Sequence, residues 1–152
     1  MDSADVAQRV EAFFADLDET VFTGDMAANM SLHVEVVEAC TVAEGIVVAV
    51  IAPWTITFVL FFEDPFPDSL TVGGRRLPVL INDVPDLGRY RSVTPIGGVE
   101  LVGSQDLARE MVAVAIGPLC DAIAKARDVG SVESPSRRTF FRSLSGGDGP
   151  PS

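Results

Sequence analysis

The sequence has almost none of the residues from which metal sites and nucleophilic active sites are usually built. Its 152 residues include one histidine, His33, and two cysteines, Cys40 and Cys120. That set is too small for a four-ligand zinc site, and the chain has no HExxH, CxxC, P-loop or GxSxG motif. We therefore expect no catalytic residue, no metal and no cofactor, and we interpret His33 as an exposed or hydrogen-bonded side chain.

The two cysteines are far apart in the sequence. Secreted proteins that depend on disulfides usually have several cysteines, whereas thiols stay reduced in the cytosol. The sequence therefore favours two buried, reduced thiols, with a disulfide between Cys40 and Cys120 as the alternative.

Basic residues are also scarce, with 11 Lys and Arg against 22 Asp and Glu, which gives a formal net charge of -11. Proteins that bind nucleic acid need clustered Lys and Arg to neutralise phosphates, so this balance argues against that class and favours a basic partner. Residues 1–134 hold 21 acidic and 8 basic residues, whereas residues 135–152 hold three arginines and one aspartate. A basic tail is thus expected to follow an acidic body.

The first residues lack the basic segment and the apolar stretch of a signal peptide, which indicates a cytoplasmic protein. One uncharged run, residues 45–62, is long enough for a membrane helix. However, Pro53 lies in its middle, β-branched residues are abundant and its flanks are acidic. We therefore interpret the run as two buried strands joined at Ala52–Pro53, and we expect no stable membrane insertion.

Two segments, residues 3–21 and residues 104–127, have apolar residues at steps of three and four, which predicts two amphipathic helices. Asp2, Ser3 or Asp5 is expected to cap the first helix. Gly117–Pro118 should kink the second helix or split it in two, because proline removes a helix hydrogen bond.

The segments between these helices have the periodicity of strands. Residues 31–36 alternate between polar and apolar, as in a half-exposed strand, and residues 45–51 are apolar throughout, as in the middle of a covered sheet. Residues 54–62 are apolar on both faces, so another protein is a candidate to cover one of them.

A hairpin that turns at Gly73–Gly74 is predicted for residues 70–81, and a short strand is predicted for residues 90–93. The connections are too short for parallel crossovers, so we predict an α+β fold with a mainly antiparallel sheet, an N-terminal helix and a C-terminal helix. Residues 1–130 are expected to form one domain, and residues 131–152 a flexible basic tail.

An acidic loop, residues 63–68, directly follows the apolar strand at residues 54–62. An apolar groove that ends in negative charge would suit a peptide with paired arginines beside an apolar segment. The alternative interpretation is a core strand followed by a solvated turn. The candidate partner-binding residues are Pro53, Trp54, Phe58, Leu60, Glu63, Asp64 and Asp68.

Several segments resemble the HybE/HupJ-type nickel-iron hydrogenase assembly chaperones. The string VAVIAPWTITFVLFF, residues 48–62, is similar to the family's apolar strand with a Thr-Pro-Trp-aromatic motif: Pro53 and Trp54 match, whereas Ala52, Thr55 and Thr57 depart from the pattern. The segments LGRYRSVTPI and SQDLA also follow the family's order, and the resemblance extends over about residues 10–144.

The resemblance implies a non-catalytic cytoplasmic chaperone that binds immature hydrogenase subunits. The resemblance further implies association with the large or small subunit precursor, including the small subunit that bears a twin-arginine signal, and a role in holding back export until assembly is complete. The twin-arginine signal itself is then a candidate for the bound segment.

The tail contains SRRTFFR, residues 136–142, which resembles a twin-arginine signal at the wrong end of a chain. We interpret Arg137, Arg138, Phe140 and Phe141 as a displayed peptide that imitates the signal of the precursor and occupies the same binding site in the free chaperone. The alternative is a flexible tail whose arginines are solvated or contact a partner.

Two other functions stay open at this point. One is a structural subunit that is retained in a hydrogenase complex. The other is a small enzyme that acts through carboxylates such as Glu63 and Asp64.

Overall fold

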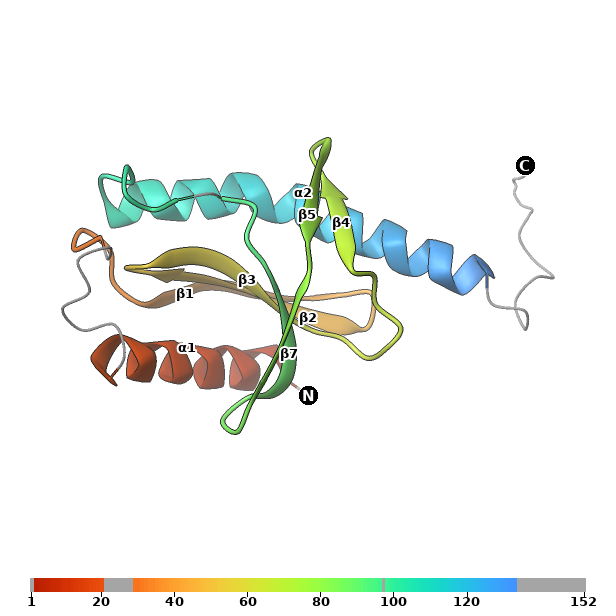
Figure 1. Ribbon diagram of the computed structural model, residues 1–152, viewed down its shortest axis with the longest axis horizontal. Coiled ribbons are helices and arrows are strands. Elements are labelled where there is room, and N and C mark those ends of the chain that lie inside the picture. The colour runs from red at the N-terminus through yellow and green to blue at the C-terminus, as the bar shows by residue number, and fades with distance from the viewer. Residues whose placement is uncertain (1, 21–28, 97, 134–152) are drawn as a thin grey trace.

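The computed structural model describes residues 2–20, 29–96 and 98–133 (Figure 1). Over these residues the chain forms two helices and seven strands. In chain order they are α1 (Ser3–Thr20), β1 (Glu35–Val42), β2 (Gly45–Ala52), β3 (Thr55–Phe61), β4 (Ser69–Val72), β5 (Arg75–Pro78), β6 (Leu80–Val84), β7 (Gly88–Val93) and α2 (Gln105–Glu133).

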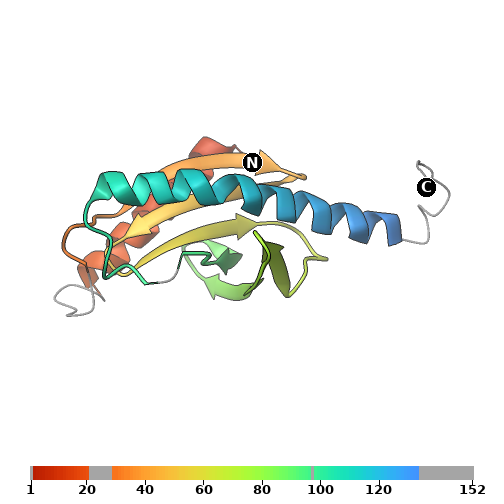
Figure 2. The same ribbon diagram turned by 90° about the horizontal axis from the view of Figure 1, so that it is seen from above.

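Five strands form one antiparallel sheet in the order β1-β2-β3-β7-β6, and β4 and β5 form a separate hairpin. The helices lie on opposite faces of the sheet, α1 on one and α2 on the other, so the domain has three layers (Figure 1). Figure 2 shows that α2 runs along the sheet and projects beyond one end of it.

Strand β2 is buried at every residue because both helices pack on it. Its side chains alternate between the two layers: Val47 and Ile51 belong to the core under α2, whereas Val48 and Val50 belong to the core under α1. This confirms the prediction of a central strand covered on both faces.

Strand β3 corrects the expectation that another protein covers one of its faces. Ile56, Phe58 and Leu60 are fully buried in the core under α2, and Val59 is fully buried in the core under α1. Trp54, just before the strand, lies with the α1 layer and not on the face of Phe58, and its ring stacks on Phe14 of α1.

The helix ends follow the sequence signals. The Asp2 carboxylate accepts a hydrogen bond from the Ala4 N–H (3.2 Å) and the Ser104 hydroxyl accepts one from the Leu107 N–H (3.1 Å), so each caps its helix. Of the two predicted effects of Gly117–Pro118, the split of the second helix is wrong, because α2 is continuous, whereas the kink stays a prediction. The carbonyl that Pro118 leaves without a donor is that of Val114, and Val114 is exposed, so water can bond to it.

Two strand predictions need adjustment. The strand predicted at residues 31–36 begins later, as β1 at Glu35, and continues to Val42. The hairpin does turn at Gly73–Gly74, where both φ angles are positive, but its second arm ends at Pro78. The chain then enters the main sheet as β6, which the sequence pattern did not separate from the hairpin.

The predicted fold class is confirmed: the sheet is antiparallel, with one helix before it and one after it. Helix α2 continues through Glu133, past the domain boundary predicted at residue 130. Residues 134–152 lie outside the described residues, and so does most of the connection after α1. Within the described residues neither helix is sufficiently long and apolar to span a membrane.

Burial on α2 predicts which of its side chains stabilise the fold. Leu119→Ala should lower the free energy of unfolding by about 2–5 kcal/mol, because Leu119 is 0% exposed and its removal leaves a cavity under the helix. Val114→Ala on the same helix is the matched control, since Val114 is 77% exposed and should change stability by about 0.5 kcal/mol or less. Urea denaturation of both variants measures the difference, and equal losses would contradict the packing of α2.

Candidate binding groove at the end of the sheet

The turn between β1 and β2 has an unfavourable backbone. Val42 pairs with Gly45, so the turn consists of Ala43 and Glu44, whose φ angles are +47° and +68°. Glycine and asparagine are the usual residues at such positions, and other L-residues there cost roughly 1–2 kcal/mol each. The turn thus holds the Glu44 carboxylate at the end of the sheet at a cost in stability.

The aromatic residues after β3 pack against the same end of the sheet. Phe62 lies so close to Gly45 that a β-carbon at that position would collide with its ring. The Phe62 ring also contacts Phe66, with 5.1 Å between ring centroids. Arg127 of α2 lies over the Phe62 ring at 5.3 Å and donates hydrogen bonds to the carbonyls of Glu63 (3.0 Å) and Pro65 (3.2 Å). Helix α2 therefore holds the acidic loop in place.

Two arginines of β7 hold the same loop from the other side. Arg91 is only 5% exposed, donates to the Phe62 carbonyl (2.9 Å), pairs with Asp64 and lies over the Phe66 ring at 5.0 Å. Arg89 donates to the other Asp64 oxygen (3.0 Å). These hydrogen bonds, first from Arg91 and then from Arg89, hold the pKa of Asp64 below its usual range. Asp64, expected to offer its charge to a partner, is thus already paired within the chain.

An open groove of about 500 Å³ lies where these parts meet. Ile46 of β2, Phe61 of β3 and Leu87 before β7 give it apolar walls. Glu44 and Glu63 give it two carboxylates, and Arg89 gives it one guanidinium. Within the described residues the carboxylates of Glu44 and Glu63 form no ion pair or hydrogen bond, so this side of the groove carries uncompensated negative charge.

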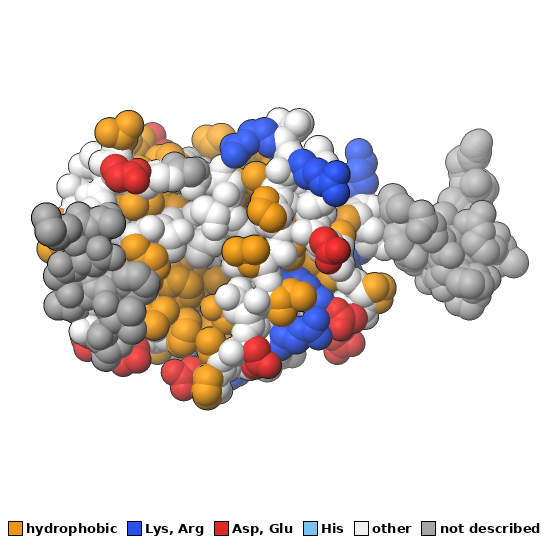
Figure 3. All heavy atoms as spheres, in the orientation of Figure 1, with side chains coloured by type: hydrophobic (Ala, Val, Ile, Leu, Met, Phe, Trp, Pro, Cys, Tyr) orange, Lys and Arg blue, Asp and Glu red, His pale blue; other side chains and the backbone are white. Residues whose placement is uncertain are grey.

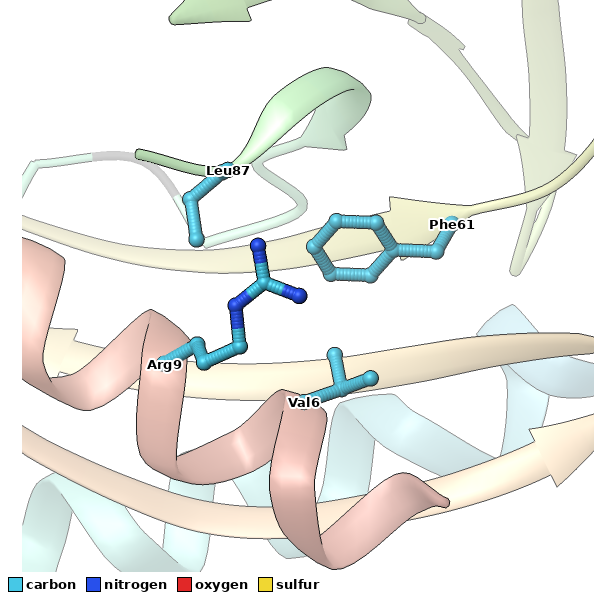
Figure 4. A pocket seen from close by; sticks show the side chains of 4 residues that line it. All are labelled: Val6, Arg9, Phe61 and Leu87. Atoms are coloured by element: carbon cyan, nitrogen blue, oxygen red, sulfur yellow. The ribbon is translucent and has the colours of Figure 1, made fainter. Parts of the chain in front are cut away.

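A smaller pocket of about 50 Å³ adjoins the groove and shares Phe61 and Leu87 with it. Figure 4 shows Arg9 of α1 reaching between Leu87 and the Phe61 ring, with Val6 beside them. The Arg9 guanidinium donates to the Asp86 carbonyl (3.1 Å). Apolar surface therefore continues from the groove toward α1 and ends at a second cation. In Figure 3 basic and acidic side chains stand next to each other at the right-hand end of the molecule, and apolar side chains show to their left.

The structure separates the predicted partner-binding residues into three groups. Pro53 and Trp54 lie at the far end of the sheet from the groove, and Phe58 and Leu60 are fully buried core residues. Glu63 lines the groove, Asp64 lies beside it in its ion pairs, and Asp68 is exposed at the end of the same loop. The four tail residues, from Arg137 to Phe141, lie outside the described residues.

The sequence interpretation did not identify Glu44, Leu87 and Arg89 as groove residues. One local signal was present: Arg89 and Arg91 are two apart on a strand, so they share a face and can reach one carboxylate. Which carboxylate they reach depends on contacts across 25 and 27 positions of the chain, which no local pattern contains.

The residues considered for metal binding and catalysis do not gather here. His33 is exposed, and the Gln105 side chain bonds its backbone N–H (3.0 Å) and its carbonyl (3.2 Å). Within residues 2–20, 29–96 and 98–133, no three His, Cys, Asp or Glu side chains are close enough to hold a metal. Both cysteines are free thiols, as predicted, but they are half-buried and not fully buried, and they are neighbours, with 3.9 Å between the sulfurs.

Comparisons with known proteins agree with the resemblance read from the sequence. A family model described as NiFe-hydrogenase assembly, chaperone, HybE matches residues 5–143, which is nearly the whole chain. No curated protein and no solved structure matches it.

The ion pairs of Asp64 predict how acid affects stability. Because the folded-state pKa lies below that of the unfolded chain, the contribution of Asp64 is present above about pH 4 and is lost as the pH falls through the folded-state pKa. The stability difference between the wild-type protein and Asp64→Asn should therefore be constant near neutral pH and shrink below about pH 4. Urea denaturation across this range measures it, with Asp68→Asn as the control on the same loop. A difference that does not depend on pH would contradict the pairing.

Proposed function

The chain belongs to the HybE family of NiFe-hydrogenase assembly chaperones, and from this premise we propose that it binds the precursor of a hydrogenase subunit in the cytoplasm, before export or complex formation. The family match over residues 5–143 is the observation that carries the proposal. The excess of acidic residues supports a basic partner segment. Its task is binding, so it needs no catalytic residue.

We further propose that the groove at the end of the sheet receives the precursor. Its apolar walls suit large aliphatic or aromatic side chains, and the open carboxylates of Glu44 and Glu63 suit guanidinium groups. A twin-arginine signal has both, because its paired arginines stand beside apolar residues. Recognition of such a signal is therefore the activity that this site supports best.

The strained turn supports a role for Glu44. Residues held at positive φ are costly and persist where the surrounding structure or a function requires them. Gly45, directly after the turn, has a packing reason to be glycine, because Phe62 occupies the space of a β-carbon. Within the described part of the chain, Glu44 makes no ion pair or hydrogen bond that would account for a glutamate at this positive φ. Binding of a cation from the partner would account for it.

The other predicted residues act indirectly in this proposal. Asp64 holds the loop in position through Arg89 and Arg91, so that Glu63 faces the groove. Phe58 and Leu60 fix β3 beneath α2. At the far end of the sheet Trp54, next to Pro53, stacks on Phe14 and so packs this end against α1.

Capture from hydrogenase-expressing cells tests the chaperone function. The wild-type protein should recover a subunit precursor, and Glu44→Lys with Glu63→Lys should recover much less, because both open carboxylates of the groove become cations. Glu100→Lys with Glu110→Lys is the matched control, since it makes the same charge change at exposed positions outside the groove and should bind normally.

Each result of this capture has one interpretation. No subunit recovered while precursor accumulates would contradict the chaperone function. If both double variants lost precursor recovery equally, the proposal that the precursor binds in the groove would be wrong. A separate purification of active hydrogenase tests the alternative function. Stoichiometric presence of the protein in that enzyme would identify it as a structural subunit.

The turn gives a sharper test with single substitutions. Glu44→Gly should stabilise the fold by up to about 1 kcal/mol, because glycine accepts the positive φ, and yet weaken binding of a synthetic twin-arginine peptide several-fold. Ala43→Gly is the control: it relieves the same kind of strain one residue earlier, at a position that does not line the groove, and should leave affinity unchanged. Thermal denaturation and peptide titration measure the two effects. If Glu44→Gly left the affinity for the peptide unchanged, Glu44 would not be part of the binding site.

A further inference from the structure

The two cysteines connect the edge of the sheet to the long helix. Cys40 lies on β1, which is an edge strand, and Cys120 lies on α2, 80 positions later. Their sulfurs are 3.9 Å apart, and both side chains are half-buried against the core under α2. The first half of α2 is already fastened to the same strand, because Arg109 pairs with Glu35 at 3.0 Å. The thiols lie at a second point of contact farther along both elements.

We propose that Cys40 and Cys120 form a reversible disulfide that fastens α2 to β1 when the protein meets a small-molecule disulfide such as oxidised glutathione. The sulfurs are in van der Waals contact and need to approach by less than about 2 Å to reach the bond length of about 2.05 Å. Rotation of the two side chains and a small shift of the helix toward the edge strand can supply this movement.

The reaction balances with glutathione disulfide as the oxidant. The Cys40 thiol loses its proton and attacks one sulfur of glutathione disulfide, which forms a mixed disulfide and releases one glutathione thiolate. The Cys120 thiol then loses its proton and attacks the Cys40 sulfur of the mixed disulfide, which forms the internal bond and releases the second glutathione thiolate. The two cysteines give up two electrons and two protons, and two glutathione thiols are the products.

The surroundings set the order of these steps. Burial is the largest of several causes that together raise the pKa of Cys120 to about 12; the others are the neighbouring Cys40 and the carboxylates of Glu38 and Asp121. Cys120 therefore keeps its proton at neutral pH, and Cys40 attacks first. Once Cys40 is in the mixed disulfide, its own contribution to the pKa of Cys120 is gone. The second step is also intramolecular, so a high effective concentration offsets the small fraction of thiolate.

The bond would also support the groove, a consequence that rests on the proposed function. On β1, Cys40 is followed by Thr41, which lines the groove. On α2, Arg127 bonds the loop that carries Glu63, another groove residue. A helix fastened to β1 near both contacts keeps the walls of the groove at a fixed separation. Preorganisation of this kind should tighten peptide binding.

The test uses the full chain, reduced and then equilibrated in glutathione buffers of increasing disulfide content. Acid quenching, alkylation and intact-mass measurement should show a monomer that loses both alkylatable thiols and carries no glutathione. Its Tm should rise by about 5–15 °C, because the bond closes a long loop, and dithiothreitol should reverse both changes. Cys40→Ala and Cys120→Ala are the controls, and each should keep one alkylatable thiol or carry one glutathione.

Three results would overturn the proposal: two thiols that remain alkylatable in strongly oxidising buffer, disulfides that form between chains, or an internal bond that leaves the Tm unchanged. Titration of a twin-arginine peptide into both forms tests the consequence for the groove separately. Tighter binding by the oxidised form, by roughly threefold or more, supports it, and equal affinity contradicts it. Absence of binding by both forms would instead contradict the proposed function and leave the disulfide standing.

Discussion

The burial of β2 and β3 between two helices is the constraint on which the rest of the structure depends. Most side chains of both strands are apolar, and the hydrophobic effect favours covering both of their faces. Because α1 and α2 cover them, the strands have no large apolar face left for a partner. For this reason the proposed binding surface is at the end of the sheet, where the strands stop and Phe61 and Leu87 line a groove.

The buried arginine at this end organises the loop around it. A guanidinium that is 5% exposed must have its donors satisfied and its charge compensated, since desolvation is otherwise very costly. Arg91 meets this requirement with the Phe62 carbonyl, Asp64 and the face of Phe66, all from the segment after β3. These contacts with Arg91 hold the loop in place. The two neighbouring acids therefore differ in role: Asp64 is paired within the fold, and the proposed function assigns Glu63 to the partner.

The sequence predicted the elements well where their signal was local. The apolar run of β2, the period of α1 and α2 and the Gly73–Gly74 turn each depend on a few consecutive residues. The sequence analysis was wrong where contacts between distant segments determine what covers a strand. The cover over β3 comes from helices at both ends of the chain, and the stacking of Trp54 on Phe14 turns that ring toward α1. The same limit applies to the site, because the partners of Asp64 and the contact between the two thiols join segments that are far apart in the chain.

The strand order gives the groove a direction. Across the end of the sheet it runs from the β1–β2 turn, past the end of β3, to the start of β7. Glu44 lies at the first of these points, Phe61 and Glu63 at the second, and Leu87 and Arg89 at the third, with Arg9 of α1 near Leu87. In the proposed complex, a bound segment places its cations toward Glu44 and Glu63 and its apolar side chains against Phe61 and Leu87. The opposite placement would bring its cations to Arg89 and Arg9, and like charges at short range oppose binding. The charges of the groove therefore orient a bound segment, in addition to selecting its composition.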